Sequence, residues 1–254
     1  MTISLPRPYD DLVFMTPLAE PRADALVRFL TPGLTGTVLD IGCGWGELLM
    51  RVVAAAPEAQ GLGIDLDAGS IDHGRRLAGE RGLTDRVTLV CGDAAAEAPE
   101  HVEAVICIGA SQVWGPPVQD NKPVDYASAL AAVRAKVGRG ARVVYGEGVW
   151  SRPPTTEAVA PLAGRLDELV ALPDLVELAV AAGLMPVAVH EANVDEWDEF
   201  ESGYSACYAS WLAVHGPDHP EAGEVRARAE RQRVGYLRGY RGILGMAYLA
   251  LLAV

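Results

Sequence analysis

The chain has 254 residues, of which half are apolar and 22% are charged, a balance that excludes a disordered or fibrous protein and favours one globular domain. Its formal net charge of -13 makes it a poor candidate for binding a nucleic-acid backbone, which requires clustered basic residues. The four cysteines form no C-x-x-C pair, and no apolar run is long enough to cross a bilayer. Scattered cysteines and the lack of a signal-peptide pattern predict a cytoplasmic protein.

Short runs of β-branched residues alternate with longer helical patterns from residue 33 onward. Strands are predicted at 37–41, 60–64, 86–91, 102–108, 141–145 and 185–190. Helices are predicted at 47–56, 68–81, 124–137 and 174–182. This alternation indicates βαβ units, and therefore an α/β fold with a mainly parallel sheet.

Two regions depart from this alternation. Residues 1–32 precede the first strand and contain a predicted helix at 19–30. Residues 192–241 predict two further helices, the first with an aromatic face and the second rich in arginine. We expect these regions to form a helical cap on a single domain, whose core comprises about 33–191 and a last strand within 242–254.

The most informative stretch is the glycine loop V-L-D-I-G-C-G-W-G-E, which follows the first strand and opens a helix. Glycines at 42, 44 and 46 allow a sharp turn and let a ligand lie against the backbone. A dinucleotide-binding G-x-G-x-x-G loop has its third glycine where this chain has Glu47. The earlier third glycine favours a nucleoside ligand without a pyrophosphate.

Carboxylates follow the next two strands, at Asp65 and Asp93. With Asp40 they place three acids on the carboxyl edge of adjacent strands, where open α/β sheets bind ligands. Asp65 is suited to accept from both hydroxyls of a ribose. Asp67 precedes the next helix, and we interpret it as the helix cap.

In order and spacing, the segments V-L-D-I-G-C-G-W-G, G-I-D-L-D and C-G-D-A resemble the first three motifs of the class I S-adenosylmethionine-dependent methyltransferases. The resemblance covers about 33–191 and the closing strand. The segments T-P-L-A-E-P-R-A-D, G-A-S-Q-V-W-G and G-E-G-V-W-S-R-P-P-T also resemble an uncharacterised subfamily that acts on small molecules.

The resemblance implies a Rossmann-like seven-stranded sheet of order 3-2-1-4-5-7-6, with the last strand antiparallel and helices on both faces. It implies S-adenosylmethionine as cofactor and S-adenosylhomocysteine as product. Asp40 and the glycines would hold the methionine part, Asp65 the ribose, and Asp93 with Ala94 the adenine. The cofactor-binding set so implied is Asp40, Gly42, Gly44, Gly46, Asp65, Leu66, Asp93, Ala94, Ile108 and Gly109.

Methyl transfer is an in-line displacement that depends mainly on alignment, so no catalytic triad is expected, and none is visible. Glu147, at the end of the fifth strand, is the candidate general base, or alternatively a carboxylate that fixes the Gly146–Gly148 turn. Gln112 is a candidate hydrogen-bond partner of the acceptor. The residues predicted to contact the acceptor are Ser111, Trp114, Trp150, Tyr204 and Tyr208. The aromatic helix that carries the last two is expected to pack against the fold, to cover the acceptor, or to do both.

We therefore expect an enzyme, monomeric or homodimeric, that methylates a small molecule. A non-catalytic cofactor-binding module is the alternative from another class. A nucleic-acid methyltransferase is less favoured, because the [DN]-P-P-[YFW] motif is missing after the fourth strand. No metal is expected, since no acid follows that strand to bind Mg²⁺.

Overall fold

The computed structural model describes residue 5, residues 11–115 and residues 122–254. One seven-stranded sheet has the order β3-β2-β1-β4-β5-β7-β6. The last strand pairs antiparallel with both of its neighbours, and the other pairs are parallel. This confirms the predicted topology. The strands are β1 (Thr37–Ile41), β2 (Gln60–Asp65), β3 (Val87–Cys91), β4 (Val102–Ile108), β5 (Val137–Trp150), β6 (Leu184–Glu191) and β7 (Leu244–Ala253).

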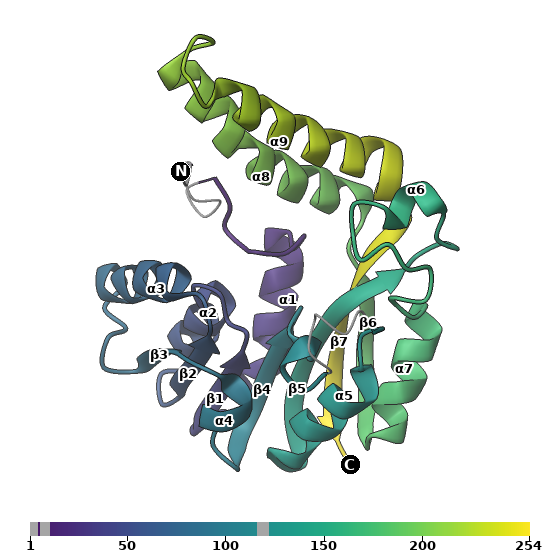
Figure 1. The fold of residues 1–254 in the computed structure, drawn as a ribbon. Coiled ribbons are helices and arrows are strands. Elements are labelled where there is room, and N and C mark those ends of the chain that lie inside the picture. The colour runs from purple at the N-terminus through teal and green to yellow at the C-terminus, as the bar shows by residue number, and fades with distance from the viewer. Residues whose placement is uncertain (1–4, 6–10, 116–121) are drawn as a thin grey trace.

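Helices cover both faces of the sheet (Figure 1). They are α1 (Glu20–Leu30), α2 (Glu47–Ala55), α3 (Ala68–Glu80), α4 (Ala94–Glu97), α5 (Tyr126–Ala135), α6 (Thr156–Val159), α7 (Leu172–Ala181), α8 (Val194–His215) and α9 (Ala222–Val234), with a 3-10 turn η2 (Ser111–Val113) and a π-helical end η4 (Gly235–Tyr240). Strand β4 shows how the sheet divides the core, because side chains alternate between the faces. Ile106 joins the apolar cluster on one face, and Val105 and Cys107 join the cluster on the other.

Strand β5 is longer than predicted at both ends. Gly138, Arg139 and Gly140, which separate the predicted helix from the predicted strand, lie inside β5 at an irregularity, where pairing with β4 moves from Val102↔Val137 to Ala104↔Arg142. At its other end β5 continues to Trp150, because β7 pairs with it as far as the Trp150↔Leu244 contact. The glycines near both ends made the strand look shorter in the sequence than long-range pairing makes it.

Helices α8 and α9 form a helical hairpin that extends beyond the carboxyl edge of the sheet (Figure 1). The aromatic face of α8 is shared between two environments. Trp197 packs in the main core, whereas Trp211 packs against Ala222 and Val225 of α9. The expected packing onto the N-terminal helix or the sheet is therefore confirmed for the start of the helix at Trp197, whereas its distal part packs on α9 instead. Within the part of the chain that the structure describes, no helix is long and apolar enough to span a membrane.

Candidate functional site

The glycine loop makes a left-handed path between β1 and α2. Gly42, Gly44 and Gly46 have φ of 65°, 55° and 74°, values that side chains disfavour. At Gly42 a Cβ would lie 2.5 Å from the Cβ of Ala110, so this turn packs directly against the segment after β4. At Gly44 the nearest atom to such a Cβ is 3.9 Å away, so the loop surface stays open there.

Asp65 holds this loop from the end of β2. Its Oδ2 accepts from the Gly44 amide at 2.8 Å, and its Oδ1 accepts from the Asp67 amide at 2.9 Å. Asp67 in turn accepts from the Ser70 amide at 2.6 Å and caps α3, as predicted. Asp65 is only half-buried, so it keeps lone pairs for hydroxyl donors of a ligand.

Asp40 lies at the end of β1 with 5% of its surface exposed. Burial, and secondarily the charge of Asp65, raises the pKa of Asp40 well above its usual value. A cationic group bound beside these two carboxyls would stabilise the ionised form. The site is therefore suited to a ligand that carries a positive charge.

A cavity of about 380 Å³ opens beside these residues. One wall is polar and comes from the sheet edge and the glycine loop. The other is apolar and comes from the N-terminal segment, α8 and β7. The predicted residues that line the cavity are Asp40, Gly42, Gly44, Asp65, Ile108 and Gly109. The residues that line its apolar wall include Phe14, Met15, Leu18, Trp197, Phe200 and Met246.

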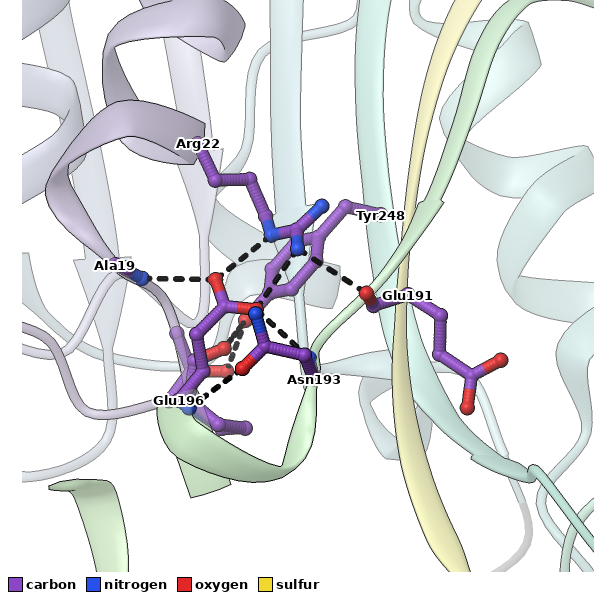
Figure 2. Close-up of polar contacts among 8 residues, drawn as sticks. Ala19, Arg22, Glu191, Asn193, Glu196 and Tyr248 are labelled. Carbon is purple, nitrogen blue, oxygen red and sulfur yellow. Dashed lines mark hydrogen bonds and ion pairs between the residues drawn. The ribbon is translucent and has the colours of Figure 1, made fainter. Parts of the chain in front are cut away.

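We call residues 13–19 the strap, because they run across this cavity before α1 begins. Figure 2 shows how the Glu196 carboxylate ties the strap to the start of α8. It accepts from the Ala19 amide at 3.1 Å, from Arg22 at 2.9 and 2.8 Å, and from the Asn193 amide at 2.8 Å. Arg22 also donates to the carbonyl of Glu191 at 3.1 Å. Although burial alone would raise the pKa of Glu196, the hydrogen bonds from Arg22, Asn193 and Ala19 lower it.

Two further side chains fix the strap. The Tyr248 hydroxyl donates to the Pro17 carbonyl and is bonded to the Thr16 hydroxyl, both at 2.9 Å (Figure 2). The indole of Trp45, inside the glycine loop, donates to the Val13 carbonyl at 3.0 Å. The apolar wall is thus attached to the last strand, to α8 and to the glycine loop itself.

The remaining predicted cofactor residues lie outside this cavity. Gly46 caps α2 and packs close to Leu89, and Leu66 is 76% exposed. Asp93 accepts from the Ala95 amide at 2.9 Å and caps α4, while Ala94 is buried. Leu66 follows β2, and Asp93 and Ala94 follow β3, at the same edge of the sheet. The adenine-binding role of Asp93 and Ala94 and the cofactor contacts of Gly46 and Leu66 stay predictions.

Glu147 does not face the cavity. One of its oxygens accepts from the Ser111 amide and the other from the Gly148 amide, each at 3.0 Å. These contacts match a carboxylate that fixes local backbone, although Gly146–Gly148 lies within β5 and forms no turn. Its role as general base stays a prediction. Gln112 is exposed and donates to the Gly109 carbonyl at 3.2 Å, so its side chain supports the loop after β4.

None of the predicted acceptor residues is among those that line this cavity, and their role stays a prediction. Ser111 is fully buried with its hydroxyl bonded to Tyr145. Trp150 is buried and donates to the Leu166 carbonyl at 3.1 Å. Tyr208 lines a separate cleft of about 1040 Å³ between α9 and α6.

Two other predicted acceptor residues stay close to the site without lining it. Trp114 is half-buried and packs against the core on the α5 side. The Tyr204 hydroxyl donates to the Met15 sulfur at 3.4 Å, and Met15 lines the cavity. Tyr204 therefore supports the apolar wall from behind.

Sequence reasoning missed the residues that build the apolar wall. Phe14 and Met15 precede the first predicted helix, where no periodic pattern marks them. Trp197 and Phe200 belong to the aromatic face that the sequence does show, one to three turns before the tyrosines selected from it. Asn193 caps the N-terminus of α8 and so fixes where the helix begins. This cap could have indicated that the first turns of α8, directly after the sixth strand, lie nearest the edge of the sheet.

Comparisons with known proteins extend over the whole chain. Residues 38–131 match the family described as "Methyltransferase domain". The uncharacterized protein YjhP of Escherichia coli strain K12 is 28% identical over 240 residues, which are 93% of this chain and 92% of YjhP. A solved methyltransferase from Geobacter sulfurreducens, in complex with S-adenosyl-L-homocysteine, is 27% identical with a TM-score of 0.81 and full coverage of both chains. Another from Thiobacillus denitrificans, also in that complex, has the same identity and TM-score over 99% of this chain and 100% of its own.

Proposed function

We propose that this chain, which is an S-adenosylmethionine-dependent methyltransferase, transfers the cofactor's methyl group to a small and largely apolar acceptor held under the strap. The observation that carries the proposal is the two-sided cavity. Its polar wall suits a nucleoside that carries an amino acid, and its apolar wall offers no charged group to an acceptor.

The residues present fit the cofactor. Asp40 is a buried carboxyl whose pKa is raised by burial and by Asp65, so it gains from the cationic amino end of a methionine moiety. Gly44 leaves open space where a side chain would stand, and Asp65 lies beside it to take ribose hydroxyls. When bound, S-adenosylmethionine supplies an electrophilic methyl group that an acceptor lone pair takes by in-line displacement, with the S–C electrons left on sulfur.

The protein's part in this reaction is to align the acceptor and to exclude water. Ile108, the last residue of β4, and Gly109 after it line the same cavity as the strap, and together with the strap they would position the acceptor. Among the described cavity-lining residues the only carboxylates are Asp40, Asp65 and Glu47, and Glu47 is paired with Arg51 and Arg81 at 2.8 Å. We infer that the acceptor arrives with a free lone pair, or releases its proton to solvent, without a dedicated base.

Calorimetry with S-adenosylhomocysteine tests the cofactor half of the proposal. The wild type should bind, and Asp65→Ala should bind at least about tenfold more weakly, because a carboxylate partner of both loop and ribose is lost. An exposed acid on α3, Asp72, provides the matched control Asp72→Ala. Equal binding by Asp65→Ala and wild type would contradict the proposed site.

Transfer itself is tested with labelled S-adenosylmethionine and a fractionated metabolite extract. Label in an apolar small-molecule fraction would support the proposal. Cofactor binding with no labelled product in any fraction would favour a non-catalytic binding module. Label in nucleic acid would contradict the small-molecule acceptor, although the acidic net charge of -13 argues against that partner. The cytoplasmic location and the monomeric or homodimeric state remain predictions.

A further inference from the structure

The arginine-rich helix α9 and the π-helical end η4 that follows it play no part in the cofactor cavity. Together they carry five arginines and two glutamates, whereas the whole chain has a formal net charge of -13. Neither element contributes a residue to the lining of the cofactor cavity. They form a basic segment on an acidic protein, and the proposed reaction gives this segment no role.

One side of the basic segment borders the cleft of about 1040 Å³ between α9 and α6. Arg228, Arg231 and Arg238 all line this cleft, and Ala160 and Pro161, at the end of α6, form an apolar part of its wall. No residue lines both this cleft and the cofactor cavity, and the cleft has more than twice the volume. It is therefore a separate space with room for an organic molecule.

The protein neutralises the arginines of this cleft only in part. Arg228 and Arg231 share one oxygen of Glu224, with nitrogen–oxygen distances of 2.8 and 3.4 Å. Arg238 is exposed and forms no ion pair or hydrogen bond with the residues that the structure describes. Each guanidinium group has five N–H donors, so several donors in the cleft stay free for a ligand.

The acids of the lining do not cancel this charge. Glu224 is divided between two arginines, as described above. Glu157 and Glu230 also line the cleft, but both are exposed, and neither is bonded to an arginine in the described part of the chain. Exposed carboxylates that make no direct contact with a cation are hydrated and neutralise it weakly.

Tyr208 adds an uncharged donor to the same cleft. Its hydroxyl forms no hydrogen bond with a described residue. Burial is the main cause that raises the pKa of this hydroxyl, and the charges of Arg228 and Arg231 act against the rise. The hydroxyl therefore lies near the two guanidinium groups and keeps its proton at neutral pH.

We propose that this cleft is a second ligand site, which binds an organic acid through its ionised carboxylate while the apolar body of the acid lies on the small residues between α6 and α9. A guanidinium group binds a carboxylate by two parallel hydrogen bonds, which are stronger than bonds between neutral groups. The small side chains of Ala160, Pro161 and Ala227 leave room for the apolar body beside the ring of Tyr208. The inference goes beyond the proposed function, because the site shares no residue with the cofactor cavity.

Two probes of nearly equal shape test the proposal: 2-naphthoate, which is ionised at neutral pH, and 2-naphthamide, which is not. Each probe is titrated into the protein by calorimetry at neutral pH, with and without saturating S-adenosylhomocysteine. Arg238→Gln removes an arginine of the cleft without breaking an ion pair among the described residues. Arg226→Gln is the matched control, because Arg226 is an exposed arginine of the same basic segment that does not line the cleft.

We expect the wild type to bind 2-naphthoate about tenfold more tightly than 2-naphthamide, the effect of one charge-assisted pair. Arg238→Gln should reduce this preference to about threefold or less, and Arg226→Gln should keep it. The proposal is overturned if the wild type binds no naphthoate or shows no preference, if Arg238→Gln keeps the preference, if Arg226→Gln loses it equally, or if S-adenosylhomocysteine displaces the probe. A protein that binds naphthoate but not S-adenosylhomocysteine would contradict the proposed function alone, so the two failures are distinguishable.

Discussion

The two walls of the cavity are built in different ways. The polar wall consists of backbone and short side chains that lie within 26 residues of one another, from Asp40 to Asp65. The apolar wall joins the strap to α8 and β7, which lie about 180 and 230 residues further along the chain and contact the strap through Glu196 and Tyr248. The residues proposed to bind the cofactor are thus brought together mainly by local sequence, and those proposed to bind the acceptor by long-range contacts. Changes to the first wall should act on cofactor affinity, and changes to the second on stability and acceptor recognition.

The largest effect is expected from Gly42→Ala. Its Cβ would lie 2.5 Å from the Ala110 Cβ, and φ is 65°. The loop must move, so affinity for S-adenosylhomocysteine measured by calorimetry should fall about 100-fold, equivalent to roughly 3 kcal/mol of strain and lost contacts. Gly79→Ala on α3 is the control, because its Cβ meets no atom within 4 Å. Unchanged binding by Gly42→Ala would mean that the ligand does not lie on this loop.

Asp40 should couple cofactor affinity to pH. Burial and Asp65 raise the pKa of Asp40 in the folded state, so folding favours its protonated form. The stability that this adds to the folded protein is therefore present at low pH and is lost as pH rises through the raised pKa. A cationic ligand favours the ionised form, so affinity should weaken as pH falls through that same pKa. Asp40→Asn should bind S-adenosylhomocysteine about tenfold more weakly, lose this pH dependence, and melt at a higher temperature than the ligand-free wild type at neutral pH. Calorimetry across pH and thermal melts measure both effects, and a pH-dependent Asp40→Asn would refute this assignment.

Glu196→Gln tests the second wall. A glutamine has one acceptor oxygen where the carboxylate serves four donors, and it leaves Arg22 without its ion pair. We expect a loss of about 2 kcal/mol, seen as a melting temperature lower by about 4–8 °C. Affinity for S-adenosylhomocysteine should change less than about threefold, because Glu196 does not line the cavity.

Asp198→Asn is the matched control for that change. Asp198 pairs with Arg241 on the surface, where an ion pair contributes about 0–1 kcal/mol, and hydrogen bonds from Arg241 and Tyr236 lower its pKa to about 2. The melting temperature of Asp198→Asn should stay near that of the wild type. If Glu196→Gln and Asp198→Asn melt alike, the Glu196 network does not hold the strap.

The smallest effect on chemistry is expected from Glu147→Gln. Its two oxygens accept from the Ser111 and Gly148 amides, so glutamine loses one of two backbone contacts and no proton carrier. Once an acceptor is known, the rate of methyl transfer should fall less than about tenfold, with an unchanged pH profile. A fall of a hundredfold together with loss of the basic limb would restore Glu147 as the general base.

The contrast between the walls also explains what the sequence could predict. The strands, the glycine loop, Asp40, Asp65 and the Asp67 cap follow from local spacing, because a strand, a turn and a helix start are set by neighbouring residues. The strand order followed only from the family resemblance, since it depends on pairing between distant segments. The surroundings of Ser111, Trp150 and Tyr208 could not be predicted, because they come from other elements of the fold: Tyr145, Leu166 and α9. No sequence pattern within α8 alone indicates which of its faces contacts the strap.

The hydrogen bond from Trp45 to Val13 links the cofactor loop to the strap, and it therefore couples the binding of the two ligands. Trp45 stands between two glycines of the cofactor loop, and its indole holds the far end of the strap at 3.0 Å. A displacement of that loop by one ligand is transmitted to the surface that receives the other. Thermodynamic reciprocity then requires that each ligand alter the dissociation constant of its companion by one common factor.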